Sequence, residues 1–594
     1  MISLRSCHAV GLALVLGSAL QAATYEVARQ NPRADDTAPG TAEQPWKTLG
    51  QAAAKVGPGD TVLIHSGTYR ERVAVKVSGT AQAPIRFVAA PGEHVVVTGA
   101  DRLTAWQQAN TAQPVYRAPW PHRFITWNRD MAHPDDTYHR LIGRCEQVMV
   151  DGYLLRQVLS AGQLAPGTFF ADVTNRTLFV WDIGSRDLNK VFAEASTRQE
   201  VLRVEGDYVQ VCGLRFRYAA NMAQHGAVVL AGRHDTLEDC VVETMNAEGA
   251  TFTGEDAVVR RCVFRDNGQV GFGANRAHRL RFTECLVENN NTKGFDRGWE
   301  AGGDKLVLCR DAVLERSRFV RNRGSGLWFD IGNTNCTVRQ CLIAGNEGAG
   351  IFYEISYALH AQDNVIVGNG FAATAGAWGA QAGICLSSSP DGVIERNLIF
   401  GNREGFNFRE QTRTTPTIED RTERPVWNHD QIIRHNSIVR NRDAQVWGWF
   451  DMKDNRHWPA GRARLLPSRL RGSVALPDLP QGEAAAKPGD LAAAYSAKTG
   501  TGQPRNLTLE SLRLRFENNV YFAAAGQGWF VWGPTWARHQ SYSSLDEFQS
   551  NLGIDFGSRT FDPAFADGAN SISDCAKRTW RSLRTVILAG QCRA

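Results

Sequence analysis

A short motif that recurs about every 23 residues is the feature that most constrains how this 594-residue chain can fold. Each copy has an asparagine-containing turn, a glycine and a short apolar stretch, as in VRNRGSGLWFD and AGNEGAGIFYE. The glycines that we expect to open the copies are Gly226, Gly249, Gly271, Gly294, Gly326, Gly350, Gly383 and Gly405. Five of the seven intervals between them span 22–24 residues, and the other two, of 32 and 33, indicate the same repeat with an insertion.

A second series of short β-like segments runs in phase with these glycines. EDCVVE, RRCVFR, TECLVE, RQCLIA and ERNLIF each place β-branched or apolar residues after a small or amide residue. A period of 22–24 residues with about three short strands is typical of a β-helix, in which equivalent positions stack in columns. Leucine-rich repeats share the period but require Leu-x-x-Leu-x-Leu, which this chain lacks. The sequence therefore predicts an all-β fold, a right-handed parallel β-helix.

The segments outside the repeat predict further parts. Residues 45–56 form an amphipathic stretch, and the GDTVLIHSGTY segment follows it. Together they resemble the start of secreted pectate-lyase-like β-helix proteins, and the resemblance implies a helix at 45–56 that caps the core. Between 101 and 198 the period gives way to aromatic-rich β-like pieces, which indicate an inserted β subdomain. The predicted division is a signal peptide (1–23), cap and first coils (24–100), inserted subdomain (101–198), coils with the site (199–454), a Pro-, Ala- and Arg-rich loop (455–504), and a last coil with a C-terminal cap (505–594).

The first residues predict export. Arg5 precedes an apolar run from Val10 to Leu20, and the small residues Ala22 and Ala23 follow it, as in a cleaved secretory signal. No later apolar stretch approaches the ~18–20 residues that a membrane span needs. We therefore expect a secreted or periplasmic protein without a membrane span.

The composition indicates which kinds of partner and cofactor the chain is expected to bind. The chain has 66 Lys+Arg and 61 Asp+Glu, a formal charge of +5, and no dense basic run, so nucleic acid is not an expected partner. Cys240, Cys262, Cys285 and Cys341 fall in one column of the repeat, which predicts an interior stack of small residues. Cys575 and Cys592 are the best disulfide candidates, and no cysteine or histidine set has zinc-like spacing. No metal or cofactor is predicted.

An acidic pair is the sharpest functional signal. After each glycine the first, third and fifth residues are apolar, so the second and fourth should point outward from a strand of period two. The fourth positions, in order from Gly271, are Asn275, Gly298, Asp330, Glu354, Ser387 and Arg409. Asp330 and Glu354 are thus expected side by side on strands ~4.8 Å apart. That spacing is close to the ~5–5.5 Å between the two carboxyl groups of a retaining glycosidase.

Other outward residues fit a saccharide site. Trp328 and Phe352 occupy the second positions beside the acids and could stack on a sugar ring, while Arg409 could hold an anionic or hydroxyl-rich group. The same acids could instead form an exposed solvated pair, or bind a cation.

The strands GLWFD (326–330) and GIFYEIS (350–356) resemble those of the glycoside hydrolase family 120 β-xylosidases, β-helix enzymes with an inserted β domain. The resemblance covers the general plan of residues ~24–440 and is close only in these two strands. It implies that Asp330 is the nucleophile and Glu354 the acid/base. It does not imply the sugar.

Two predicted insertions should overhang this face. GWEAGGDK (298–305) carries Trp299, Glu300, Asp304 and Lys305, which either line a subsite or structure a glycine-rich turn. The second insertion, residues 371–383, should bring Trp378 near Glu354, either to cover a sugar or to pack on the coil.

Two other functions remain open at this stage. A polysaccharide lyase would use Lys305 and Arg409 on a uronic-acid polymer, although the face lacks the acidic cluster expected of a calcium site. A non-catalytic carbohydrate-binding β-helix would use the same residues without turnover. The favoured prediction is a retaining glycoside hydrolase acting on a poly- or oligosaccharide, of unknown oligomeric state.

Overall fold

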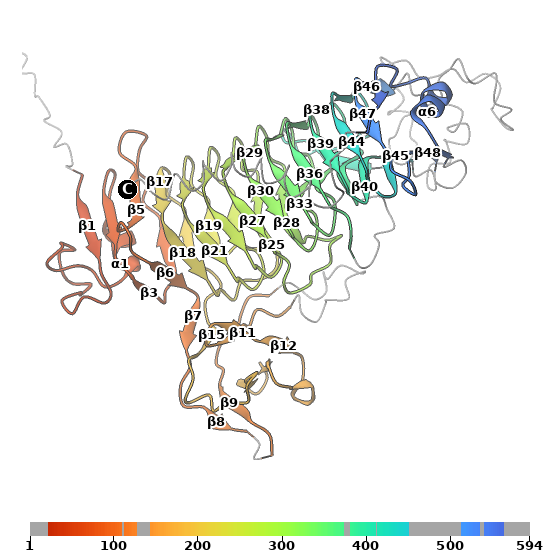
Figure 1. The fold of residues 1–594 in the computed structure, drawn as a ribbon. Coiled ribbons are helices and arrows are strands. Elements are labelled where there is room, and N and C mark those ends of the chain that lie inside the picture. The colour runs from red at the N-terminus through yellow and green to blue at the C-terminus, as the bar shows by residue number, and fades with distance from the viewer. Residues whose placement is uncertain are drawn as a thin grey trace, which may run out of the picture.

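A computed structural model describes residues 22–109, 112–126, 143–372, 381–410, 413–450, 512–534 and 540–562. They form an elongated parallel β-helix with a smaller subdomain beside its N-terminal half (Figure 1). Nearly all of the predicted signal peptide, the 455–504 loop, Cys575 and Cys592 lie outside the described residues. In the described part of the chain, no helix has the length and apolar character needed to cross a bilayer.

Three sheets of 13 strands run along the β-helix, and each coil gives one strand to each sheet. The first sheet contains β1 (Thr24–Val27), β2 (Thr61–Ile64), β5 (Ile85–Ala89), β17 (Val209–Cys212), β20 (Thr236–Glu238), β23 (Val258–Arg260), β26 (Arg281–Thr283), β29 (Val313–Glu315), β32 (Thr337–Arg339), β35 (His360–Gln362), β38 (Val393–Glu395), β43 (Ile432–Arg434) and β46 (Arg515–Glu517). The second contains β3 (Gly67–Tyr69), β6 (Val95–Thr98), β18 (Leu214–Arg217), β21 (Val241–Glu243), β24 (Val263–Arg265), β27 (Leu286–Glu288), β30 (Arg318–Val320), β33 (Leu342–Ala344), β36 (Val365–Val367), β39 (Leu398–Phe400), β44 (Ser437–Val439), β47 (Val520–Phe522) and β50 (Arg559–Thr560). The third contains β4 (Val73–Val75), β16 (Leu202–Val204), β19 (Val228–Leu230), β22 (Ala250–Phe252), β25 (Val270–Asn275), β28 (Gly302–Val307), β31 (Leu327–Asp330), β34 (Ile351–Glu354), β37 (Ala382–Ser387), β40 (Glu404–Glu410), β45 (Ala444–Phe450), β48 (Phe530–Pro534) and β49 (Gln540–Tyr542).

Side chains from all three sheets pack together inside the coils. Phe272 of β25 stacks on Phe282 of β26 with ring centroids 4.5 Å apart, and Phe282 lies 6.0 Å from Phe319 of β30. The predicted interior cysteine stack is present as buried free thiols, formed by Cys240, Cys262, Cys285 and Cys341. Stacking identical side chains at each level gives the close packing that buried apolar surface requires.

A short helix covers the N-terminal end of this core. In α1 (Leu49–Lys55), the hydroxyl of Thr48 accepts a hydrogen bond from the Gln51 N–H at 3.2 Å, and Leu49, Ala52 and Ala53 are buried. At the other end, Phe548 of α6 (Leu545–Leu552) stacks on Phe530 at 4.5 Å. Because the ends of a β-helix expose unpaired strands and apolar side chains, both helices close the core.

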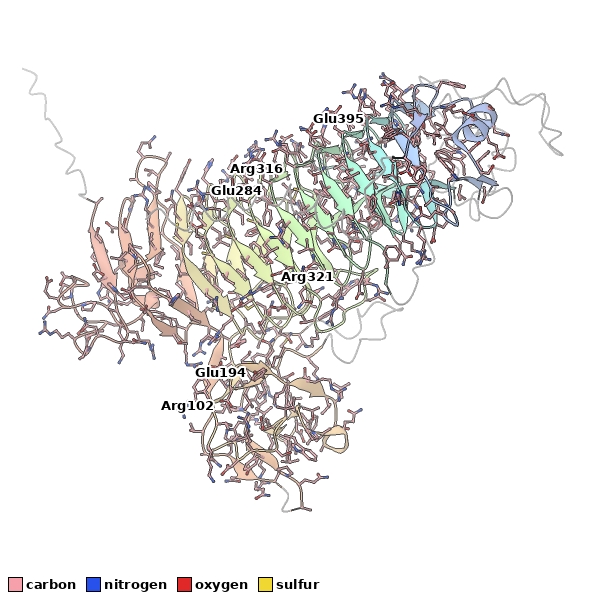
Figure 2. All side chains as sticks on the ribbon, in the orientation of Figure 1. Arg102, Glu194, Glu284, Arg316, Arg321 and Glu395 are labelled. Carbon is pink, nitrogen blue, oxygen red and sulfur yellow. The ribbon has the colours of Figure 1, made fainter. Side chains whose placement is uncertain are left out.

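The inserted β subdomain lies between β6 and β16 of the β-helix in the chain. Its strands are β7 (Ala100–Arg102), β8 (Gln107–Gln108), β9 (Val115–Pro119), β10 (Val148–Val150), β11 (Tyr153–Leu154), β12 (Arg156–Val158), β13 (Thr168–Asp172), β14 (Thr177–Trp181) and β15 (Ala193–Ser196), with a short 3-10 helix η2 (Ala161–Gln163). Glu194 pairs in register with Arg102 and accepts a 2.8 Å hydrogen bond from Arg70 of the first coils (Figure 2). The fold-class prediction, with its insertion and helical cap, is confirmed.

Ion pairs between coils reinforce the outer surface of the β-helix. Arg316 lies 3.5 Å from Glu284 on the preceding coil, and Arg434 lies 2.7 Å from Glu395 (Figure 2). At least one partner of each pair is partly exposed, and such pairs at the surface contribute little individually to stability. Contacts other than these ion pairs therefore have to fix the register of one coil on the next.

An asparagine ladder fixes it at the turn between the second and third sheets. Each side-chain amide donates to the amide oxygen of the next coil's asparagine at 2.9–3.1 Å, through Asn267, Asn290, Asn322, Asn346, Asn369, Asn402 and Asn441. Beside the ladder stands a column of glycines. A Cβ at Gly326 would lie 2.7 Å from Asn346 Nδ2 and 2.8 Å from the Gly350 carbonyl oxygen, so no larger residue fits.

One predicted coil begins at a different glycine. The sequence predicted that Gly294 opens a strand, but the strand at this level is β28, and Gly303 occupies the ladder column. A Cβ at Gly303 would lie 2.1 Å from the Gly326 carbonyl oxygen, whereas Gly294 belongs to the insertion before the strand. Gly294 lies four residues after Asn290, the spacing that Gly326 has from Asn322, whereas the insertion places Gly303 13 residues after Asn290, so the local pattern favoured the wrong glycine. As a result Gly298 is not in the outward column, and Lys305 belongs to the sheet itself.

We predict that Asn290→Ala lowers the free energy of unfolding by ~2–4 kcal/mol, because it leaves buried amide groups of Asn267 without acceptors. Asn551→Ala, which removes an exposed amide on α6, should change it by less than ~0.5 kcal/mol. Guanidinium denaturation followed by circular dichroism measures both. Equal effects of the two substitutions would show that the ladder does not hold the coils.

Candidate active site

Asp330 and Glu354 end two adjacent strands of the third sheet. Leu327, Trp328 and Phe329 of β31 pair in register with Ile351, Phe352 and Tyr353 of β34, so the next level brings the two acids together. Phe329 and Tyr353 point inward and are fully buried, which directs Asp330 and Glu354 to the outer face as predicted. Even there, the acids are only 8% and 7% exposed.

Lys305 forms an ion pair with Asp330. It extends from β28, one coil before Asp330, and its Nζ lies 3.0 Å from Asp330 Oδ2 and 3.8 Å from Glu300 Oε2. The same ammonium donates to the Trp299 carbonyl at 3.1 Å and lies 4.2 Å from the ring centre of Trp328. Among the described residues, Asp330 Oδ1 has no hydrogen-bond partner. One oxygen of Asp330 is thus fixed by a cation, and the other is buried without a hydrogen-bond partner.

Glu354 has a separate cation. Arg413 Nη1 lies 2.7 Å from Glu354 Oε1, and the Trp328 indole N–H donates to Oε2 at 3.3 Å. Sequence reasoning missed Arg413, because it lies 59 residues from Glu354 and outside the coil repeat. No local signal marks it.

Burial and charge act against each other in this cluster. Burial raises the pKa of the Asp330 carboxyl and the Glu354 carboxylate adds to this, while the Lys305 ammonium opposes both. Burial disfavours the charge of Lys305, but Asp330 and Glu300 outweigh it, so the pKa of Lys305 is raised. Burial also raises the pKa of Glu300. Lys305 therefore stays an ammonium at neutral pH.

The other predicted residues surround the pair. Trp328 and Phe352 stack on each other at 5.4 Å and are 3% and 6% exposed, so their faces are largely covered; contact with a sugar stays a prediction. Arg409 is level with Ser387, two coils beyond Glu354, and is buried.

The first insertion contributes to the same cluster. Glu300 accepts a 2.6 Å hydrogen bond from the Gln224 side chain, and Trp299 packs on Phe295 with centroids 6.3 Å apart. Trp378 of the second insertion lies outside the described residues.

Asp304, which the sequence assigned to the overhanging insertion together with Glu300 and Lys305, lies in the strand β28 and is fully buried. It is level with Phe272 of the core column, so it points inward, and its Oδ1 accepts the Trp328 backbone N–H at 2.9 Å. Burial raises the pKa of this carboxyl well above its usual range. The sequence predicted that this coil opens at Gly294, so it assigned the inward positions to residues after Gly294 instead of those after Gly303.

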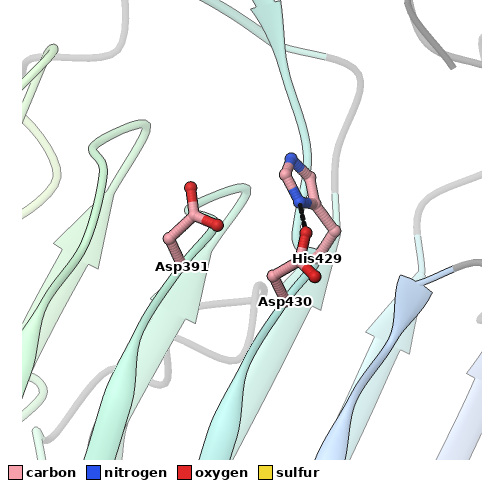
Figure 3. A group of neighbouring side chains, drawn as sticks. All are labelled: Asp391, His429 and Asp430. Atoms are coloured by element: carbon pink, nitrogen blue, oxygen red, sulfur yellow. Dashed lines mark hydrogen bonds and ion pairs between the residues drawn. The ribbon is translucent and has the colours of Figure 1, made fainter. Parts of the chain in front are cut away.

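A group of possible metal ligands lies elsewhere, on the turns before β38 and β43. Ligand atoms of Asp391, His429 and Asp430 lie within 4.8 Å of one another (Figure 3). His429 Nδ1 is 2.7 Å from Asp430 Oδ2, and Arg513 pairs with the same carboxylate. Because a guanidinium already neutralises Asp430, we assign no metal to this group.

Comparisons with known proteins agree with the fold. A family model described as a right handed beta helix region matches residues 226–382. The uncharacterized protein YwoF of Bacillus subtilis (strain 168) is 36% identical over 107 residues, which are 16% of this chain and 23% of that protein. The match thus spans about a quarter of the curated relative.

Among solved structures, the complex of XylC with xylose has a TM-score of 0.61 at 16% identity and covers 92% of this chain and 88% of that chain. A glycoside hydrolase has a TM-score of 0.45 at 14% identity and covers 63% of this chain and 95% of that chain. At these identities the likeness extends to the fold alone. The chain is a right-handed parallel β-helix protein, as the sequence predicted.

Proposed function

We propose that this protein is a secreted glycoside hydrolase that cleaves a poly- or oligosaccharide with retention of configuration, using Asp330 and Glu354. The observation that carries the proposal is that these two acids sit level on adjacent strands, nearly buried, each with its own cation. Strands ~4.8 Å apart bring the carboxyl groups close to the separation of a retaining pair.

In the proposed reaction Asp330 attacks the anomeric carbon while its carboxylate stays paired with Lys305. The glycosidic C–O bond breaks as Glu354 donates its proton to the leaving oxygen. Glu354 then takes a proton from water, the resulting hydroxide attacks the anomeric carbon, and the bond to Asp330 breaks. Lys305 keeps Asp330 ionised for the first step.

The substrate class draws on the comparisons. XylC, whose fold matches over most of this chain, is known in complex with xylose. Trp328, Phe352, Arg409, Trp299, Glu300, Lys305 and Trp378 are the residues that we propose line the saccharide site. A pentose or hexose is small enough to approach two acids that share one level of the sheet.

The lyase alternative is less well supported. A lyase would need Lys305 as a neutral amine that removes a proton from a uronic-acid carbon. Instead, Lys305 is paired with Asp330 and its pKa is raised, so the amine stays protonated. A purely carbohydrate-binding protein would have little reason to bury two ionisable carboxyl groups, since their desolvation is costly.

We predict that the mature protein releases reducing ends from aryl glycosides or polysaccharides without new absorbance at 235 nm. Glu354→Ala should lower kcat/KM by ~10²–10⁴-fold on substrates that need a proton donor, and Asp330→Ala should abolish turnover. Asp363→Ala, which removes an exposed acid away from the pair, should have no effect. Proton NMR of the first product gives the anomeric configuration. Absorbance at 235 nm that survives in Asp330→Ala and disappears in Lys305→Ala would make the protein a lyase.

We predict that Lys305→Met is destabilising in a pH-dependent way. Without the ammonium, the raised pKa of Asp330 rises further, so above pH ~4 the folded state binds a proton that the unfolded state has lost. Stability relative to the wild type should therefore fall as pH rises from 4 to 8, reaching a loss of ~3 kcal/mol. Urea unfolding at each pH measures this, and Lys305→Met/Asp330→Asn should show a smaller slope, to which only the buried Glu300 still contributes. A pH-independent loss in the single variant would contradict the pairing.

A further inference from the structure

We infer that Arg413 is a positioning residue that orients Glu354 as the proton donor, and that the hairpin carrying it completes the site. The inference rests on the proposed glycosidase function. It assigns a role to a segment that is not part of the coil repeat.

The contacts of Glu354 distinguish its two oxygens. Oε1 is 2.7 Å from Arg413 Nη1, the geometry of a strong charge-assisted hydrogen bond. Among the described residues, Oε2 receives the longer 3.3 Å contact from the Trp328 indole. Both partners can donate but not accept, and the shorter, charged contact on Oε1 favours the proton of a neutral Glu354 on Oε2, where the competing donor is weaker. Arg413 thereby selects which oxygen carries the proton to the leaving group.

The hairpin holds Arg413 firmly at this position. It consists of β41 (Arg413–Pro416) and β42 (Glu423–Val426), inserted between β40 and β43. The Pro416 carbonyl lies against Gly332, two residues after Asp330, where an added Cβ would be 2.5 Å from that oxygen.

Further contacts anchor the rest of the hairpin. Thr415 and Val426 are buried, and Glu419 pairs with Arg310 of the turn after β28, one coil before Asp330. The hairpin is thus seated on the Asp330 coil and the coil before it, while its first residue reaches Glu354 on the coil after them.

This role has a chemical signature that a structural role lacks. A phenolate is a poor leaving group and needs the proton of the acid, whereas 2,4-dinitrophenolate leaves without one. Misdirecting Glu354 should therefore slow glycosides of the first kind and spare those of the second. Because kcat/KM reports the steps up to the glycosyl-enzyme, it is the quantity to compare.

The experiment measures kcat/KM of the full-length mature protein on phenyl and 2,4-dinitrophenyl glycosides, starting with β-xylosides and otherwise using the sugar that the substrate panel identifies. Arg413→Ala should lose ~10²-fold on the phenyl glycoside and much less on the dinitrophenyl glycoside. Added guanidinium chloride should restore part of the loss, and sodium chloride at equal concentration should not. Arg424→Ala is the matched control, since it removes an arginine from the same hairpin that pairs with the exposed Asp420.

Equal losses on both glycosides, or no loss on either, would overturn the inference while leaving the proposed function intact. Thermal unfolding of each variant separates an equal loss caused by misfolding from one caused by chemistry, and either counts against the positioning role. If the wild type hydrolyses no glycoside, or Glu354→Ala keeps full activity, the proposed function itself fails, and the inference fails with it.

Discussion

The vertical register of equivalent residues on successive coils is the constraint on which the rest of this structure depends. The asparagine ladder ties each coil to the next inside the body, and the glycine column beside it leaves no room for a side chain. Once the register is fixed, strands of three or four residues suffice, since their neighbours supply the remaining hydrogen bonds. The same register brings Asp330 level with Glu354.

Burying two acids on that register is costly, and the chain offsets the cost with two cations of different origin. Lys305 comes from the preceding coil of the same sheet, whereas Arg413 comes from a hairpin outside the repeat. Lys305 pairs with Asp330 and Arg413 pairs with Glu354. The two acids therefore have different surroundings although their backbone positions are equivalent. Such a difference between paired carboxyl groups is what lets one act as nucleophile and the other as acid.

The repeat and the insertions therefore contribute different parts of the site. The coils give a rigid surface on which side chains recur at fixed levels, and the insertions at the turns add groups that the repeat does not carry. Glu300 and Trp299 enter from the segment before β28, and Arg413 from the hairpin after β40. Insertions at turns leave the ladder intact, because the hydrogen bonds between coils run through the strands and the asparagines.

The sequence by itself determined the three-strand coil, the inward and outward alternation, and hence the pairing of Asp330 with Glu354. These properties repeat locally, so a period and an alternation of two suffice to find them. It placed one coil start at Gly294 instead of Gly303, because Gly294 has the usual spacing of four residues from Asn290 and only the contact of Gly303 with Gly326 shows the difference. Nor did it reveal Arg413 or the inward position of Asp304. Their roles arise from contacts between segments distant in the chain, which only the tertiary structure decided.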